Sequence, residues 1–197
     1  MPGHLIAFEG LDQSGKQTQA ERLRDALTHA GHRVHALTFP DYHTAIGAEI
    51  GRALAGEREY AADTLQLLYI ANRYEYRPRI EGWLAEGAMV VCDRYLASSV
   101  AYGESQGLDG GWLLDVQRGL PQPSLTILLD IEPDASLRRK QAARDRFERD
   151  MALLTRVAAA YRRLSDGRGW IRVDGRRDKD AVSADVLKAV QTQLGLL

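Results

Sequence analysis

The chain is poor in cysteine, has almost no net charge and lacks long apolar runs. Its one cysteine, Cys92, lies inside an apolar stretch, which excludes a disulfide within the chain and predicts a buried thiol. The formal net charge of −1 provides no global basic field for nucleic acid or an anionic membrane. No run approaches the length of a membrane-spanning helix, and Met1–His4 shows no basic-plus-apolar leader. We therefore expect a cytoplasmic protein that binds neither nucleic acid nor membrane.

Strand and helix periodicities alternate along the chain, without repeats, low-complexity tracts or a long linker. This pattern predicts one α/β domain over residues 1–197. The runs 88–93 and 124–131 are nearly continuously apolar, which is typical of parallel strands covered by helices on both faces. Ligands of such sheets bind beyond the carboxyl ends of the strands. The expected strands are 4–9, 33–38, 88–93, 124–131 and 169–173, and the expected helices are 16–30, 44–55, 61–86, 96–106, 110–118, 133–142, 147–165 and 178–194.

A glycine-rich loop follows the first expected strand. Residues 10–16 have the Gly-x4-Gly-Lys spacing of a phosphate-binding loop, with an apolar strand before them and an amphipathic helix after them. Backbone N–H groups, the positive end of the helix and the Lys16 ammonium can bind polyphosphate, which predicts a nucleoside triphosphate site. A Ser or Thr hydroxyl usually follows the lysine and ligates magnesium, but this chain has Gln17. Because an amide is a weak magnesium ligand, we expect water or Asp93 to provide more of the coordination.

Aromatic and basic side chains follow the second strand and recur on a later helix. Phe39–Tyr42 forms an aromatic-rich corner where a ligand of the sheet would lie, although a plain turn is the other interpretation. Tyr69 and Arg73 stand four residues apart and share a helix face. An aromatic ring that stacks on a base beside a guanidinium that reaches its edge suits nucleobase recognition. A surface aromatic–arginine pair is the alternative.

The third expected strand ends in Asp93 and Arg94. A carboxylate at a strand end beside a phosphate loop can hold magnesium, directly or through water. An arginine next to it can bind a second phosphate in a bidentate manner. A salt-bridged strand terminus is the structural alternative. Together with the phosphate loop, the pair favours a site for two phosphorylated ligands.

These segments together resemble the thymidylate kinases, which transfer a phosphate from ATP to dTMP. The resemblance implies a P-loop nucleoside monophosphate kinase fold, with a five-stranded parallel sheet, helices on both faces and a short lid at about 138–149. It also implies ATP as phosphate donor, Mg2+ as cofactor, a homodimer and a role in dTTP synthesis. The motifs cover essentially the whole chain: Phe8–Asp12, Phe39–Pro40, Ala71–Arg73, Asp93–Tyr95, Ser98–Tyr102, Gly119–Pro123 and Leu129–Pro133.

The resemblance also implies roles for individual residues of the acceptor site. Asp12 would hold the 3′-hydroxyl of the sugar, Tyr69 would stack on thymine and Arg73 would meet the base edge. Arg94 would bind the acceptor phosphate, and Tyr102 would pack under the deoxyribose. The complete expected dTMP site is Asp12, Phe39, Pro40, Tyr42, Tyr69, Arg73, Arg94, Ser98, Ser99 and Tyr102.

The donor site and the catalytic residues follow from the same resemblance. Residues 138–149 contain six basic side chains and two acidic ones, a pattern usual for a solvated helix face. Phosphoryl transfer also needs cations where charge sits in the transition state. Family members place the assisting arginine in the loop or in the lid, and Gln13 in this loop implies the lid type. The expected catalytic residues are Lys16, Arg94, Arg144, Arg146 and Arg139; the expected ATP site is Gly10, Leu11, Asp12, Gln13, Ser14, Gly15, Lys16, Gln17, Thr18 and Arg176.

Three alternatives to a dTMP kinase follow from the same residues. A deoxynucleoside kinase has a neutral hydroxyl as acceptor and benefits from a carboxylate base, whereas the pair Asp93 and Arg94 suits a phosphorylated acceptor better. A kinase for another nucleoside monophosphate is the second alternative. The third is a P-loop switch that is not a kinase, which would not need the second nucleotide pocket implied by Tyr69, Arg73 and Tyr102.

Overall fold

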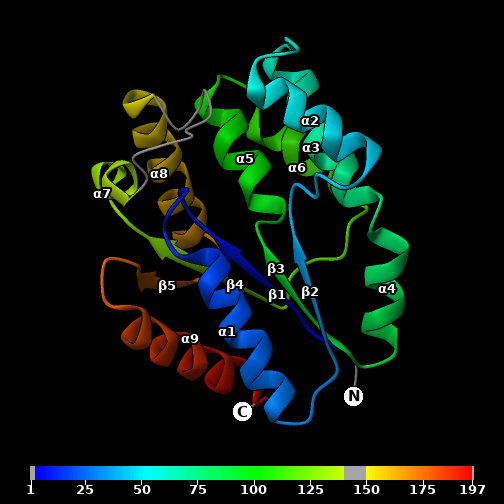
Figure 1. Cartoon of the computed structure of the whole chain (residues 1–197), viewed down its shortest axis with the longest axis vertical. Coiled ribbons are helices and arrows are strands. Elements are labelled where there is room, and N and C mark those ends of the chain that lie inside the picture. The colour runs from blue at the N-terminus through cyan, green and yellow to red at the C-terminus, as the bar shows by residue number, and fades with distance from the viewer. Residues whose placement is uncertain (1–2, 140–149, 197) are drawn as a thin grey trace.

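Five parallel strands form one sheet within the residues that the computed structural model describes, 3–139 and 150–196. The order across the sheet is β2-β3-β1-β4-β5, so the first strand lies at the centre (Figure 1). The strands are β1 Leu5–Glu9, β2 Val34–Thr38, β3 Met89–Asp93, β4 Leu125–Asp130 and β5 Ile171–Asp174. The helices are α1 Lys16–His29, α2 Ala45–Ala55, α3 Ala62–Tyr74, α4 Arg77–Ala85, α5 Leu96–Ser105, α6 Gly110–Asp115, α7 Pro133–Arg139, α8 Met151–Asp166 and α9 Lys179–Leu194.

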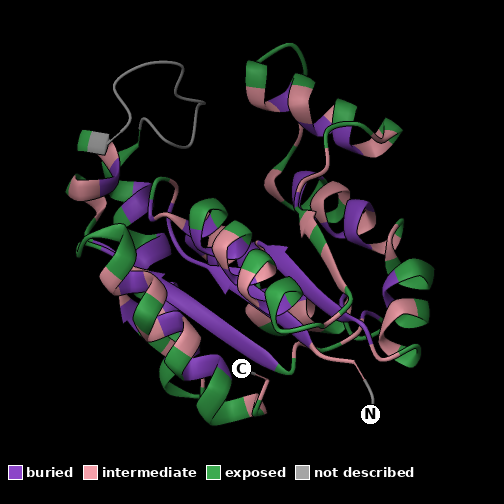
Figure 2. Ribbon diagram, turned by 60° about the horizontal axis from the view of Figure 1, so that its bottom comes forward, coloured by how far each residue is buried: buried purple, intermediate pink, exposed green. Residues whose placement is uncertain are grey.

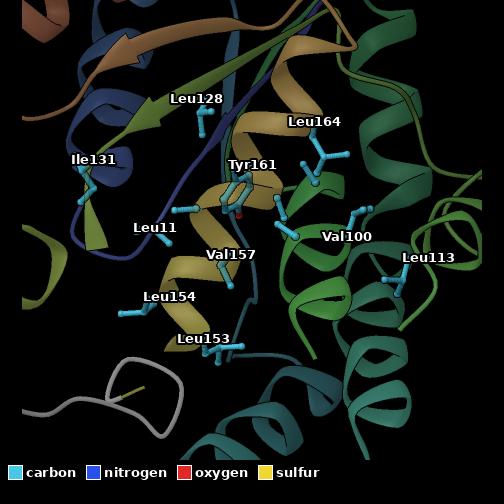
Figure 3. Packing of buried hydrophobic residues seen from close by; sticks show 14 of the residues in the cluster. Leu11, Val100, Leu113, Leu128, Ile131, Leu153, Leu154, Val157, Tyr161 and Leu164 are labelled. Atoms are coloured by element: carbon cyan, nitrogen blue, oxygen red, sulfur yellow. The ribbon is translucent and has the colours of Figure 1, made fainter. Parts of the chain in front are cut away.

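Helices cover both faces of the sheet because its inner strands are apolar on both sides. Ile6 and Phe8 of β1 face α1 and α9, whereas Leu5 and Ala7 face the opposite side, where α4 packs. A third cluster joins β4 to α5, α6 and α8 and includes the buried Tyr161 (Figure 3). The three inner strands β3, β1 and β4 are accordingly buried, whereas the edge strands β2 and β5 and the outer helix faces are partly exposed (Figure 2). The predicted five-stranded parallel sheet with helices on both faces is confirmed.

The expected helix over 61–86 was wrong as a single element. The chain forms α3 and then α4, with a break at Glu75 and Tyr76. Pro78 is the second residue of α4. Its ring cannot donate a backbone hydrogen bond and would collide with the carbonyl group of Tyr74 in a continuous helix, so the helix has to restart. The expected helix over 110–118 is also shorter, because α6 ends at Asp115.

The strand order brings several loops to one edge of the sheet. Phe8 and Thr38 are both in register with Asp93, and Glu9 is in register with Leu128. The segments that follow β1, β2, β3 and β4 therefore emerge side by side at the carboxyl edge, where ligands of parallel sheets bind. Elsewhere, Cys92 is buried in β3 as expected, and none of the helices in the described part of the chain is long and apolar enough to cross a membrane.

Candidate active site

The loop between β1 and α1 leaves the N-terminus of α1 open to an anion. Gly15 precedes the helix at a φ of 96°, no side chain caps the helix, and its first turn has no acidic residue. Gly10 lies so close to β4 that a Cβ there would be 2.5 Å from the Leu129 carbonyl oxygen. Gln13 adopts a φ of 59°, a left-handed conformation that is uncommon outside glycine. The loop therefore presents backbone N–H groups and the positive end of a helix to a phosphate.

The Lys16 ammonium lies buried beneath this loop. Its Nζ donates to the Leu11 carbonyl oxygen at 2.7 Å, and the residue is 5 % exposed. Burial, together with the nearby charge of Arg94, lowers the pKa of Lys16 to about 8, although Asp93 and Asp12 act to raise it. The oxygens of a polyphosphate would supply the negative charge that this lysine lacks.

The other polar residues of the loop region differ in where they point. Gln17 donates to Glu21 at 3.0 Å on the exposed side of α1, and Thr18 is exposed on the same helix. The buried Ser14 hydroxyl has no hydrogen-bond partner within residues 3–139 and 150–196. The Ser14 hydroxyl is thus left without a hydrogen bond to the described residues, whereas the Gln17 amide is already paired.

A pocket opens next to the loop between α3, α5 and the corner after β2. It is lined by all ten side chains expected around the acceptor, from Asp12 to Tyr102, and also by Leu54, Gln66 and Gln106. Helical spacing could have identified two of these additional residues, because Gln66 precedes Tyr69 by three positions and Gln106 follows Tyr102 by four. Leu54 carries no such signal in the sequence.

Arg73 forms the inner wall of this pocket. It is 2 % exposed and donates from Nη1 to Ser99 Oγ at 2.7 Å and to Gln117 Oε1 at 3.4 Å. Its buried Nε has no partner within the described ranges, and burial lowers the pKa of the guanidinium. A buried arginine held by neutral groups needs a polar ligand. This environment suits the edge of a base better than a surface aromatic–arginine pair.

The corner after β2 is held in place by Asn72 of α3. The Asn72 side chain accepts from the backbone N–H of Asp41 at 2.8 Å and donates to Thr44 Oγ1 at 2.9 Å. Phe39 is buried and its peptide bond to Pro40 is cis. The sequence motif contained Asn72 but assigned it no role. Its contacts indicate that it shapes the pocket wall without lining it.

Arg94 stands between the pocket and the phosphate loop. Its Nη2 donates to Asp12 at 2.6 Å, and its Nη1 donates to Ser98 Oγ at 3.2 Å and to Tyr161 Oη at 3.3 Å. The guanidinium carbon lies 5.5 Å from the centre of the Tyr102 ring. Its φ is 65°, a strained conformation for a non-glycine residue, and such strain concentrates at functional sites. The geometry keeps a largely buried cation at the junction of the two sites.

Asp12 links the loop to this arginine. It accepts hydrogen bonds from Arg94 and, at 3.0 Å, from Tyr102. Burial acts to raise the pKa of Asp12, but the charges of Arg94 and Lys16 outweigh it and hold the pKa well below the usual 3.8.

We predict that Asp12 contributes stability at neutral pH that disappears in acid. Because its folded pKa is depressed, this stability is complete above about pH 5 and declines as pH falls below the unfolded value of 3.8. Asp12→Asn should therefore unfold at a lower temperature than the wild type at pH 7, with a difference that shrinks steadily below pH 3.8. Differential scanning calorimetry at pH 7, 5, 3.5 and 2.5 measures it. A difference that stays constant over this range would contradict the assignment.

Asp93 offers a site that fits magnesium. It is 9 % exposed, and its buried Oδ1 atom has no hydrogen-bond partner within the described ranges. Over the same ranges no three His, Cys, Asp or Glu side chains are arranged to enclose a metal. Magnesium is commonly held by one or two carboxylates, with waters and substrate phosphates completing its shell. One orphaned carboxylate oxygen beside a phosphate loop fits that chemistry.

The remaining expected residues are Arg176 and the three arginines expected in or beside the lid. Arg176, in the turn after β5, is exposed and ion-paired with Asp174 at 2.8 Å. The neighbouring Gly175 brings this turn against the loop, since a Cβ there would lie 3.1 Å from the Ser14 carbonyl oxygen. Arg139 ends α7. Arg144 and Arg146, and with them most of the expected lid at 138–149, lie outside the described residues.

Comparisons with known proteins identify the family of this chain. The thymidylate kinase family model matches residues 8–186. The human thymidylate kinase is 33 % identical over 187 residues, which cover 93 % of this chain and 88 % of that protein. The probable thymidylate kinase of Staphylothermus marinus is 34 % identical over 195 residues, covering 98 % of this chain and 96 % of its own. The structure of Candida albicans thymidylate kinase superposes with a TM-score of 0.83 at 27 % identity, covering 100 % of this chain and 94 % of that one.

Proposed function

This chain belongs to the thymidylate kinase family, and we propose that it transfers the γ-phosphate of ATP to the phosphate of dTMP, yielding dTDP for dTTP synthesis. It is a dTMP kinase with a P-loop nucleoside monophosphate kinase fold. The observation that carries the proposal is the convergence of all ten expected acceptor side chains on one pocket beside the phosphate loop. A nucleotide switch would have no use for that second pocket.

The acceptor pocket suits a deoxynucleoside monophosphate. Tyr69 would stack on the base, and the guanidinium of Arg73 would donate to the edge of the base. Tyr102 would pack under the sugar, and Asp12 would accept from its 3′-hydroxyl. Arg94 would bind the acceptor phosphate, exchanging part of its present contact with Asp12 for the ligand.

Positioning and charge neutralisation carry the reaction. The acceptor oxygen belongs to a phosphate that is already anionic, so no general base is required. That oxygen forms a bond to the γ-phosphorus as the bond from the γ-phosphorus to the departing ADP oxygen breaks. Lys16 and Arg94 hold the two anionic groups in line against their mutual repulsion. An arginine of the lid, Arg144, Arg146 or Arg139, would stabilise the transferring group.

We propose that Asp93 holds a magnesium ion, directly or through water. The buried Oδ1 without a partner supports this assignment. When bound, magnesium would neutralise charge on the donor phosphates. The Gln17 side chain would contribute little, since it pairs with Glu21 on the exposed side of α1.

A coupled assay of ADP release with ATP and magnesium tests the proposed function. The acceptors are dTMP, dUMP, dCMP, dGMP, AMP and thymidine, supplied one at a time at equal concentration. We expect strong turnover with dTMP, with dUMP as the only trailing substrate. Preference for thymidine would point to a nucleoside kinase, preference for another monophosphate would change the substrate, and turnover that no acceptor stimulates would favour a switch.

We also propose that the protein works as a cytoplasmic homodimer, with residues 1–197 as a single domain and 138–149 as its lid. The homodimer follows from the family resemblance. Sedimentation velocity tests the dimer: a species at the mass of one 21.9 kDa chain would contradict it.

A further inference from the structure

The side chain of Glu9 is fully buried behind the active site, at the carboxyl end of β1. It is 0 % exposed and accepts four hydrogen bonds. Two come from backbone N–H groups, of Tyr95 at 2.9 Å and of Ser98 at 3.3 Å, and both reach Oε1. The other two come from the hydroxyls of Ser98 at 2.7 Å and Tyr161 at 3.1 Å, and both reach Oε2. The proposed acceptor and donor sites do not include Glu9. Burying a carboxylate costs free energy even when four donors satisfy it, so its position calls for an explanation.

The first pair of hydrogen bonds caps the N-terminus of α5 with a side chain that comes from β1. Tyr95 is the residue before α5 and its own side chain caps nothing. Glu9 therefore supplies the acceptor that an Asp or Ser at this position would normally provide. Arg94 immediately precedes this cap and is anchored to β1 by its backbone N–H, which donates to the Phe8 carbonyl oxygen at 2.9 Å. These contacts hold the strained turn at Arg94 between β1 and α5.

The second pair of hydrogen bonds orients two hydroxyls toward Arg94. The Ser98 and Tyr161 oxygens lie 2.9 Å apart and both contact the Arg94 Nη1 atom. When these hydroxyls donate to Glu9, their lone pairs are left to face the guanidinium. Tyr161 comes from α8 and lies in the middle of the cluster formed with Leu11 and Val100 (Figure 3). Glu9 thus fixes both the backbone and the guanidinium of Arg94 without touching the substrate pocket itself.

We propose that Glu9 is a positioning residue that aims Arg94 at the acceptor phosphate, through Ser98 and Tyr161. The inference rests on the proposed role of Arg94 in binding that phosphate. It assigns a specific task to the negative charge of Glu9. A glutamine could accept from the two backbone N–H groups, but its NH2 group would donate to the two hydroxyls. Their protons would then have to turn toward the Arg94 cation.

Glu9→Gln tests the proposal, because it keeps the cap of α5 and changes the hydroxyl network. We expect kcat/KM for dTMP to fall about tenfold or more, because charge-assisted hydrogen bonds are lost. KM for ATP should be nearly unchanged. Tyr161→Phe should move the dTMP parameters in the same direction by less. Ser105→Ala is the matched control, because that hydroxyl is also buried in α5 but bonds only to the Ala101 carbonyl oxygen. Melting temperatures show which variants are folded.

A double-mutant cycle with Arg94→Ala separates the two proposals. If Glu9 acts through Arg94, Glu9→Gln should lower kcat/KM for dTMP by less than about threefold in the Arg94→Ala background. An equal loss in both backgrounds, or losses for ATP and dTMP alike, would overturn the positioning role. If Arg94→Ala alone leaves the dTMP kinetics unchanged, the proposed acceptor-phosphate role fails instead. If Glu9→Gln does not fold, Tyr161→Phe takes its place in the cycle with Arg94→Ala. A loss of kcat/KM for dTMP that is equal in both backgrounds would then overturn the positioning role.

Discussion

Replacing Arg94 with alanine should lower kcat/KM for dTMP by about a thousandfold. The guanidinium lines the pocket and is ion-paired with Asp12, with a side chain only 14 % exposed. A cation shielded from water in this way offsets more phosphate charge than an exposed one. Its loss would leave the acceptor phosphate without its own counter-charge, so its repulsion from the donor phosphates would be reduced only by the groups on the donor side. KM for ATP should change less than threefold, because Arg94 lines the acceptor pocket.

Two comparisons make this result specific. Arg94→Lys should recover part of the activity, since an ammonium restores the charge but not a bidentate grip. Arg77→Ala removes an exposed arginine paired with Glu81 on α4, and should leave the kinetics unaltered. Steady-state kinetics in the coupled assay, with each substrate varied in turn, measure all three variants. Unchanged dTMP parameters in a folded Arg94→Ala protein would contradict the role.

Replacing Lys16 with alanine should lower kcat by about a thousandfold. The ammonium lies buried under the phosphate loop, and within the described part of the chain its one hydrogen-bond acceptor is the Leu11 carbonyl oxygen. Donor phosphates would provide its missing counter-charge, most strongly as charge moves onto the departing ADP. Lys188→Ala, at an exposed position on α9, is the matched control and should behave as the wild type. Single-turnover measurements with saturating ATP distinguish a slow chemical step from weak binding.

The pH profile offers an independent check on Lys16. Burial and the charge of Arg94 disfavour its protonated form and lower its pKa to about 8 in the free protein. The profile of kcat/KM for ATP reports groups of the free enzyme, so it should fall with a unit slope as pH rises through about 8. The Lys16→Ala variant should lack that descending limb. A limb of the same position in both proteins would assign the titration to another group.

The sequence predicted the phosphate loop and the shared helix face of Tyr69 and Arg73 because those features depend on local spacing, whereas the full set of pocket residues followed from the family resemblance. The Gly-x4-Gly-Lys pattern lies within one turn between a strand and a helix, and Tyr69 and Arg73 share a face of α3 whatever surrounds it. The sheet followed from apolar runs buried on both faces. Such predictions need no knowledge of distant contacts.

Other features could not be read from the sequence because they depend on long-range contacts. Glu9 sits inside an apolar strand, and only the fold brings it to Ser98 and Tyr161. The left-handed backbone of Arg94 contradicts its local preference and is held by tertiary contacts. Pro78 could have predicted the division of the long expected helix, but the apolar and aromatic residues around it keep a helical periodicity, which favoured one continuous helix.

The position of β1 at the centre of the sheet also affects how the chain can fold while it is being translated. β1 is the first strand in the chain, yet its two neighbours are β3 and β4, and the face beneath it is closed by α9. During translation its apolar side chains would leave the ribosome followed closely by α1, but long before β3, β4 and α9 exist. Contacts so distant in sequence form slowly and leave hydrophobic surface exposed to aggregation. The strand that precedes the phosphate loop is thus fully covered only once α9, the last helix of the described ranges, has been synthesised.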